Sequence, residues 1–194
     1  MRLLVLARHD VERLLEMPRC IDLMADALAS LAHGEVVLPL RPVLQIPDSA
    51  NVFGVMPAYS SALKAIGAKL ISVYPGNHGT ALDSHQGVVV LFDGANGSPL
   101  ALMDAASITA IRTAAVSGVA TRLLARPKAA TLAILGSGVQ ARTHIDAMLA
   151  VRPFERVLVW SRRTDHARAL VSAARGKYSA AFDVAASAQD AVRA

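Results

Sequence analysis

A glycine-rich segment, Gly136-Ser137-Gly138, has the composition and position of a phosphate-binding loop. It follows the apolar run at 131–135 and precedes an amphipathic run that begins at Val139. With Ala141 it fills the three small positions of the pattern G-x-G-x-x-G/A, in which backbone amides and a helix N-terminus bind a pyrophosphate. The pattern predicts a dinucleotide site with Val139 and Gln140 in its first helical turn. The alternative is a purely structural turn between a strand and a helix.

The end of the next expected strand bears on which dinucleotide is bound. An NAD site usually has Asp or Glu there, about 20 residues after the glycines, to bind the ribose hydroxyls. This chain instead reads Trp160-Ser161-Arg162-Arg163, without a carboxylate. Guanidinium groups match phosphate oxygens, so Ser161, Arg162 and Arg163 favour the 2′-phosphate of NADP(H). NAD(H) remains possible, because both arginines can also be simple solvated residues before a helix.

Two cations interrupt apolar segments upstream. Lys69 lies in the β-rich run "GAKLIS", and Arg112 lies in "TAIRTAA", a helical run of small and apolar residues. A charged group in such surroundings requires a partner, because its burial without one is costly. Both positions therefore indicate a bound anion.

The elements that position these residues form two expected domains of an α/β protein. Residues 1–126 read as a mixed α/β domain, with expected strands at 36–46 and 51–60 and a hairpin turn at 95–97. This domain ends with a long connecting helix at 104–125. From 127 to 194 the pattern is β-α-β-α-β, which predicts the first part of a doubly wound Rossmann domain.

Composition excludes several other classes of function. The chain has 194 residues, a net charge of +5 and only 4% aromatic residues, and its basic residues are dispersed, which argues against nucleic-acid binding. Cys20 is the single cysteine, and the six histidines form no ligand pattern, so no metal site is expected. No apolar stretch reaches the roughly 18 residues needed for a membrane span. We therefore expect a cytoplasmic protein.

A longer segment carries a family resemblance. The stretch "GNHGTALDSHQGVVVLFDGANGSPLALMDAASITAIRTAAVSGVATRLLARP", followed by "LAILGSGVQA", closely resembles the ornithine cyclodeaminase/mu-crystallin family. The resemblance implies a homodimer formed through the N-terminal sheet and a nicotinamide cofactor bound between two domains. It also implies hydride transfer at the α-carbon of an amino acid or cyclic imino acid. Family activities of this kind are cyclodeaminase, ketimine reductase and amino-acid dehydrogenase.

The resemblance assigns expected roles to individual residues. Arg41, Lys69 and Arg112 match groups that bind the substrate carboxylate, and Lys69 is the expected catalytic proton carrier. The residues that match cofactor contacts are Ser84, His85, Arg112, Thr113 and Gln140. Without the resemblance, Arg41 reads equally well as a solvated loop arginine, and His85 reads as a structural histidine.

Two departures from the family pattern affect the expected activity. Ornithine-specific relatives carry a carboxylate shortly before the Met-Pro pair, whereas this chain reads Val52-Phe53-Gly54-Val55 before Met56-Pro57, which makes ornithine a doubtful substrate. The acid/base Asp of the family is expected beyond Ala194. We therefore expect the 194-residue chain to be inactive, and the alternative function is a non-catalytic NADP(H)- and small-ligand-binding protein of the crystallin type.

Overall fold

A computed structural model describes residues 2–194, and contacts within the chain divide it into two compact units. The first unit contains the residues up to Glu16 and Asp26–Thr109, and the second contains Met17–Ala25 and Ala110–Ala194. Two helices, α2 (Met17–Ala32) and α3 (Ala105–Leu124), contribute residues to both units. The division falls inside α3, whereas the sequence pattern alone indicated a boundary near residue 127.

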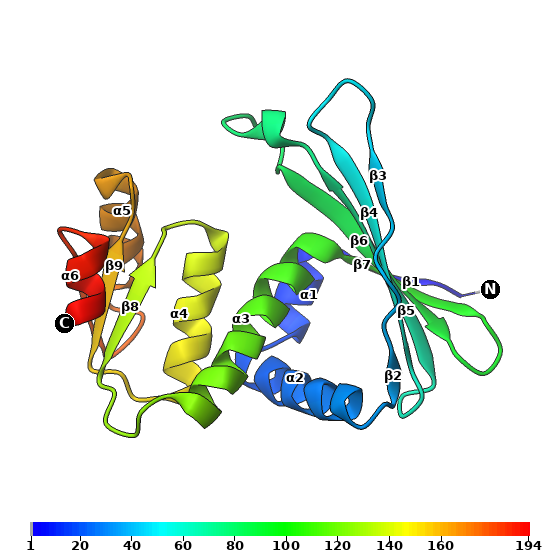
Figure 1. The fold of residues 1–194 in the computed structure, drawn as a ribbon, viewed down its shortest axis with the longest axis horizontal. Coiled ribbons are helices and arrows are strands. Elements are labelled where there is room, and N and C mark those ends of the chain that lie inside the picture. Colours follow the sequence, from blue (N-terminus) through cyan, green and yellow to red (C-terminus); the bar gives the residue numbers. More distant parts are fainter. Residues whose placement is uncertain (1) are drawn as a thin grey trace. The chain divides into compact units, whose positions relative to one another are not determined.

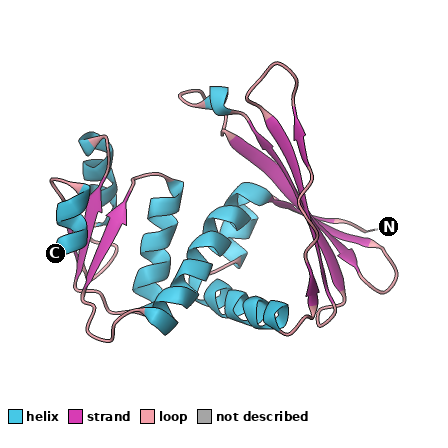
Figure 2. Cartoon of the chain, viewed as in Figure 1, coloured by secondary structure: helices cyan, strands magenta, loops and turns pink. Residues whose placement is uncertain are grey.

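A seven-stranded sheet forms the first unit (Figure 2). Its order is β1-β7-β6-β5-β4-β2, with β3 also paired to β4, and only the β1–β7 pairing among these strands is parallel. The turn at Ala95–Gly97 joins β6 to β7, as the hairpin signal predicted. The strands are β1 (Leu4–Leu6), β2 (Val36–Val37), β3 (Val43–Gln45), β4 (Val52–Ser60), β5 (Ala65–Val73), β6 (His85–Asp93) and β7 (Pro99–Asp104).

The expected strand at 36–46 is interrupted in the structure. Only β2 and β3 pair with β4, and residues 38–42 between them are extended loop. Pro39 and Pro42 lie in this loop, and a proline has no backbone N–H to donate to a neighbouring strand. Arg41 is therefore a loop residue, and its side chain is exposed.

Short helical elements flank this sheet (Figure 1). Helix α1 (Arg8–Leu14) contacts β7 and buries Val11, and a 3₁₀ turn, η1 (Pro75–Asn77), follows β5. Pro18 lies in the first turn of α2, where a missing N–H has no cost, as expected from the sequence.

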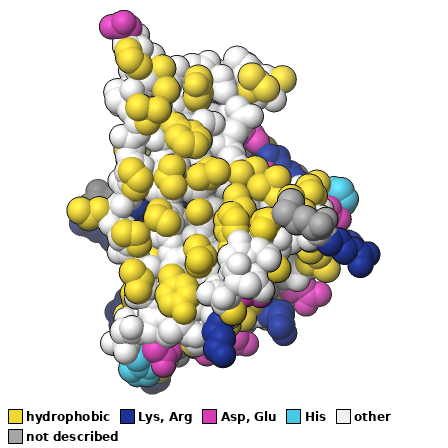
Figure 3. All heavy atoms as spheres, turned by 90° about the vertical axis from the view of Figure 1, so that its right-hand side faces the viewer, with side chains coloured by type: hydrophobic (Ala, Val, Ile, Leu, Met, Phe, Trp, Pro, Cys, Tyr) yellow, Lys and Arg dark blue, Asp and Glu magenta, His cyan; other side chains and the backbone are white. Residues whose placement is uncertain are grey.

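The two faces of the sheet differ in what they carry. Because side chains alternate along a strand, Lys69 shares one face with its register partners Met56 and Val89. The opposite face carries Phe53 and Ile66, both more than one-third exposed. In Figure 3 hydrophobic side chains are spread over much of the central part of the face turned to the viewer, and charged side chains lie toward its edges. The sheet therefore has one face with a cation among apolar neighbours and one broadly apolar exposed face.

The second unit is a β-α-β-α-β arrangement of Rossmann type. Its three parallel strands have the order β10-β9-β8, and each successive pair is joined by a helix. Val157 and Val159 on the central strand are fully buried against α4 and α5 side chains such as Ile145 and Leu170. The elements are β8 (Thr131–Leu135), α4 (Val139–Val151), β9 (Arg156–Trp160), α5 (Thr164–Ala174), β10 (Ala181–Val184) and α6 (Ala188–Arg193).

Three helices of this unit meet at Gly118 on α3. A Cβ placed there would lie 3.2 Å from the Ile21 side chain on α2 and 3.6 Å from the Ala147 Cβ on α4. Ile21 and Ala147 are almost completely buried. This close approach explains why Met17–Ala25 and the C-terminal part of α3 belong to the second unit.

Candidate functional site

The glycine loop joins β8 to α4 as the sequence pattern predicted. Gly136 has a φ of 126°, a conformation that disfavours any residue with a Cβ. Its N–H donates to the Trp160 carbonyl at 2.7 Å, and the Ser137 hydroxyl donates to Ser161 Oγ at 3.0 Å. These two bonds hold the loop against the end of β9, so the loop and Ser161 form one continuous surface.

The N-terminus of α4 is open in a way that suits an anion. Gly138 is its N-cap residue, and no side chain among residues 2–194 caps the first turn. A Cβ at Gly138 would have no heavy atom within 4 Å, so the space beside this N-cap residue is open. The first N–H groups of a helix lack partners within it and carry partial positive charge. These residues therefore fit the pyrophosphate of a dinucleotide.

The two arginines after β9 have different surroundings. The Arg163 guanidinium lies 3.0 Å from the Asp165 carboxylate, and this hydrogen bond lowers the pKa of Asp165. Arg162 is exposed and has no ion-pair partner within residues 2–194. Arg162 is thus the cation that can turn to a ligand phosphate without breaking an existing ion pair.

Lys69 lies in the middle of β5 in the first unit. Its Nζ donates to Thr109 Oγ1 at 3.4 Å, and Thr109 lies in the first turns of α3. Its neighbours across the sheet are Met56 on β4 and Val89 on β6. An ammonium that donates to a hydroxyl and lies beside apolar side chains can also bind a carboxylate.

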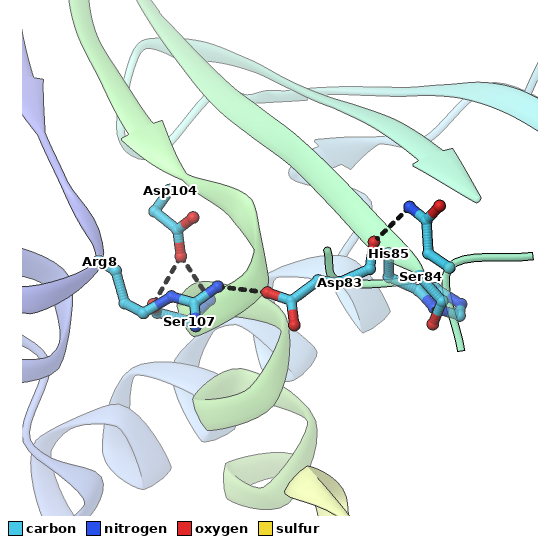
Figure 4. Close-up of polar contacts among 7 residues, drawn as sticks. Arg8, Asp83, Ser84, His85, Asp104 and Ser107 are labelled. Atoms are coloured by element: carbon cyan, nitrogen blue, oxygen red, sulfur yellow. Dashed lines mark hydrogen bonds and ion pairs between the residues drawn. The ribbon is translucent and has the colours of Figure 1, made fainter. Parts of the chain in front are cut away.

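A polar network surrounds Ser84 and His85 in the first unit (Figure 4). The Ser84 hydroxyl and His85 Nδ1 are 3.1 Å apart. On the preceding loop, the Asp83 carboxylate accepts from the Arg8 guanidinium at 2.6 Å, and the Asp83 carbonyl accepts from the Asn77 amide at 3.0 Å. The bond from Asp83 raises the pKa of Arg8. The loop that carries Ser84 and His85 is therefore fastened at both side chain and backbone.

The start of α3 is capped beside this network. The Asp104 carboxylate accepts from the Ser107 N–H at 2.7 Å and from the Ser107 hydroxyl at 2.6 Å (Figure 4). A carboxylate at this position satisfies an unpaired amide of the first turn and favours the helix dipole. Asp104 therefore fixes the origin of the helix that carries Thr109, Arg112 and Thr113.

The predicted site residues are distributed over both units. Arg41, Lys69, Ser84 and His85 lie in the first unit, with Lys69 and His85 on the same face of the sheet. The remaining predicted residues lie in the second unit, where the glycine loop and Ser161 are brought together and Arg112 is exposed on α3. Sequence reasoning missed Arg8, Asp83 and Ser137, whose contacts join segments distant in the chain.

Residues 2–194 contain no group of three or more His, Cys, Asp or Glu side chains arranged for a metal ion. None of the helices formed by these residues is long and apolar enough to cross a membrane.

The family model for the ornithine cyclodeaminase/mu-crystallin family matches residues 1–194. The chain belongs to this family. The match confirms the resemblance seen in the segment from Pro75 to Ala141 and covers the whole sequence. Curated family relatives are named as reductases and cyclodeaminases, so the family is enzymatic.

Two curated relatives illustrate the similarity of this family member. It is 44% identical over 153 residues to the ketimine reductase mu-crystallin of Mus musculus, which covers 77% of this chain and 49% of the relative. It is 34% identical over 190 residues to a Delta(1)-pyrroline-2-carboxylate reductase of Bacillus cereus, covering 98% of this chain and 58% of the relative. The chain therefore spans about half of the length of these relatives.

A solved structure agrees with this family assignment. The Delta(1)-pyrroline-2-carboxylate reductase of Thermococcus litoralis, in complex with NADH and L-proline, matches with a TM-score of 0.91 and 35% identity. The match covers 97% of this chain and 58% of that protein. The α/β fold with a Rossmann-type unit is thereby confirmed. The comparisons do not support the expectation that the chain is inactive.

Proposed function

We propose that this family member reduces a cyclic imino acid, such as a pyrroline-2-carboxylate, with a nicotinamide cofactor. The observation that carries this proposal is the position of Lys69, bonded to Thr109 and flanked on the sheet by Met56 and Val89. This arrangement offers one cation for a carboxylate and apolar surface for a ring. It offers no carboxylate along β4 for the distal amine of a diamine substrate. The names of the relatives support the same substrate class.

The residues of this chain have defined roles in the proposed reaction. Lys69, with Arg41 and Arg112, binds the substrate carboxylate and orients the imine carbon. A nicotinamide cofactor held by the glycine loop and α4 would supply the hydride for that carbon, and with one proton on the ring nitrogen the imine would become the cyclic amino acid. Lys69 is the proposed proton carrier, because an ammonium near the imine can donate and regain a proton. Ser84 and His85 contact the nicotinamide end.

The dinucleotide is proposed to lie on the glycine loop and α4. The uncapped N-terminus of α4 and the clear space at Gly138 support this placement. We favour NADP(H), because β9 ends in Ser161 and Arg162 instead of a carboxylate, and Arg162 is exposed without an ion-pair partner within residues 2–194. NAD(H) is the alternative, and the Thermococcus relative is a complex with NADH.

We also propose a homodimer formed through the exposed apolar face of the first unit's sheet. Val5, Phe53, Tyr59 and Ile66 lie on this face by strand alternation, and each is more than one-third exposed. Apolar surfaces of this extent generally mark protein interfaces. An archaeal alanine dehydrogenase dimer with bound NAD has the same fold, with a TM-score of 0.89 and 27% identity.

The test of the function is a substrate panel with the intact protein. Cyclic imines, ornithine, lysine and alanine are each incubated with NADPH, NADP⁺, NADH or NAD⁺, and cofactor absorbance and free ammonia are followed. Net oxidation of the reduced cofactor by a cyclic imine is the expected result. Ammonia released from lysine or ornithine without net redox change means a cyclodeaminase, and tight cofactor binding without turnover means a ligand-binding protein.

A substitution connects this activity to the proposed carboxylate site. Lys69→Met keeps the length of the side chain and removes its charge. We expect kcat/KM for the cyclic imine to fall about 10- to 100-fold, because a charged hydrogen bond to the carboxylate is lost. Cofactor affinity should stay unchanged. Unchanged kcat/KM in Lys69→Met would show that Lys69 does not bind the substrate carboxylate.

A further inference from the structure

A chain of hydrogen bonds joins α3 to α4 inside the second unit. The Ser117 hydroxyl on α3 lies 3.0 Å from His144 Nε2 on α4. At its two ends this contact continues to backbone carbonyls. Ser117 Oγ lies 3.4 Å from the Thr113 carbonyl, and His144 Nδ1 lies 2.7 Å from the Gln140 carbonyl. These contacts place Thr113, Ser117, His144 and Gln140 in one row, in which the single Ser117 hydroxyl hydrogen is donated either to the Thr113 carbonyl or to His144.

The chemistry of the partners determines how these bonds are arranged. A backbone carbonyl only accepts hydrogen bonds, so the contact with Gln140 places a hydrogen on Nδ1 of His144. In the neutral ring, Nε2 then accepts the Ser117 hydroxyl hydrogen. If the ring is protonated, Nε2 donates to Ser117 Oγ and the hydroxyl turns to the Thr113 carbonyl. Both protonation states preserve the connection between the helices.

A second polar contact between these helices lies at the end far from the glycine loop, where the Arg152 guanidinium donates to the Arg126 carbonyl at 2.6 Å and to the Ala125 carbonyl at 3.5 Å. At Gly118 the contact is between a glycine and the small side chain of Ala147. Small apolar surfaces tolerate sliding better than paired polar groups, which have one favourable geometry. Thr121 adds a weaker contact with the Met148 sulfur at 3.0 Å, about one turn further from the glycine loop. The Ser117–His144 pair is therefore the polar contact that sets the register at the cofactor end.

We propose that Ser117 and His144 are positioning residues that hold Thr113 and Gln140 in the arrangement required to bind the nicotinamide cofactor. This inference rests on the proposed function, in which the first turn of α4 contacts that cofactor, and on the family resemblance, which matches Thr113 to a cofactor contact. The pair does not touch the cofactor itself. It acts through the two residues at the ends of this row, one on each helix.

The test measures the affinity of the intact protein for the cofactor in variants that remove individual contacts of Ser117 and His144. The single tryptophan, Trp160, lies beside the glycine loop, so quenching of its fluorescence by NADPH or NADH reports binding. Ser117→Ala and His144→Ala each remove the contact between the helices. We expect each to weaken cofactor binding about 3- to 10-fold, as one neutral hydrogen bond would. The double variant should be no weaker than either single variant, because both remove the same contact.

Two conservative variants separate the tie between the helices from the contact within α4. The side-chain amide of His144→Gln reaches the position of Nε2 and can still pair with Ser117. His144→Asn reaches the position of Nδ1 and can pair only with the Gln140 carbonyl. We expect His144→Gln to stay within about twofold of the wild-type affinity and His144→Asn to match His144→Ala. These isosteric variants also keep the test valid if an alanine variant fails to fold.

Thr121→Val is the matched control, because it alters the same pair of helices away from the glycine loop. Its cofactor affinity should equal that of the wild type. Equal losses in Thr121→Val and Ser117→Ala would overturn the proposal, because general loosening of the helix pair would then explain both. Wild-type cofactor affinity in every variant would also overturn the proposal. So would cofactor affinity that is retained in His144→Asn and lost in His144→Gln. Absence of binding by the wild type itself refutes the proposed cofactor site instead.

Discussion

The Arg8 guanidinium lies 2.6 Å from the Asp83 carboxylate, although 75 positions separate the two residues in the chain. The bond fastens the loop before Ser84 and His85 to helix α1. Both side chains are more than half exposed, so the pair contributes at most about 1 kcal/mol to the free energy of unfolding. Its main effect is therefore expected to be local order in the loop.

Arg8→Gln tests this relationship. We expect faster amide hydrogen exchange at residues 78–84 and an unfolding midpoint close to that of the wild type. Because exposed ion pairs are screened, salt at about 1 M should produce a similar increase in the wild type. Arg13→Gln is the control, since Arg13 is another exposed arginine in α1 that pairs with Asp10 at 3.7 Å. If exchange at 78–84 is unaffected by Arg8→Gln, Asp83 does not order the loop.

Gly87→Ala should destabilise the first unit strongly. A Cβ at Gly87 would lie 2.1 Å from the Leu70 carbonyl oxygen, so β5 and β6 would have to separate. Overpacking of this kind costs about 1–3 kcal/mol or more. Gly67→Ala is the matched control on β5, where the new Cβ would meet only the Val90 carbonyl oxygen, at 4.0 Å. Urea unfolding should show a large decrease in the free energy of unfolding for Gly87→Ala and a small change for Gly67→Ala.

Arg162→Ala should weaken NADPH binding about 10- to 100-fold and leave NADH binding unchanged, because only NADPH carries the 2′-phosphate. Arg163→Ala should have a smaller effect, since Arg163 already pairs with Asp165. Fluorescence titration with both cofactors measures the two affinities. Equal affinities for NADPH and NADH in the wild type, unchanged in either variant, would favour the NAD(H) alternative.

The second unit should lose stability in strongly alkaline solution through the contacts of Asp146. Burial, followed by the bond to Asp146, raises the pKa of Tyr178 above its ordinary value of 10.0. Bonds with Tyr178 and Asp146 raise the pKa of Lys177 above 10.5. Both groups bind protons more tightly in the folded state, so their contribution is complete below these ordinary values and is lost as the pH rises through the folded values.

This pH dependence can be measured as urea midpoints between about pH 9 and 11.5. The wild type should lose more stability over this range than Tyr178→Phe, which has no phenol to ionise. Asp146→Asn should also flatten the profile, because the carboxylate that raises both pKa values is removed. Parallel profiles for all three proteins would show that these groups do not control alkaline unfolding.

Ile66→Lys should convert the proposed dimer to monomers. Ile66 is 39% exposed on the apolar face of the sheet, and burial of an unpaired lysine at an interface is costly. Leu123→Lys is the control, because Leu123 is 71% exposed on α3. Sedimentation equilibrium gives the masses. A monomeric wild type, or a dimer that persists in Ile66→Lys, would show that this face is not a dimer interface.

Much of the fold follows from local sequence patterns. The turn at 95–97, the proline in the first turn of α2 and the glycine loop before Val139 each depend on residues close together in the chain. Pro39 and Pro42 could have shown that 36–46 is no continuous strand, because neither residue can donate a ladder hydrogen bond. Local rules therefore predict most elements and some of their interruptions.

The contacts that support the candidate site were not predictable in the same way. Arg8 pairs with a residue 75 positions away, and Ser117 pairs with His144 at a separation of 27. Neither pair has a spacing that any regular element imposes. The linear motifs located the cofactor loop, but the groups that hold it and its neighbouring loop became visible only in three dimensions.

The packing of Ile21 against Gly118 has a consequence for how this chain can fold and be divided. The two residues are nearly a hundred positions apart, so the second unit is completed by a segment made early in synthesis. Closure of such a long loop slows folding, and the N-terminal part of α2 must wait for α3 and α4 to emerge. A fragment that begins at residue 127 would expose the surface of α4 around Ala147. Genetic dissection of this protein should therefore keep Met17–Ala25 together with the nucleotide-binding unit.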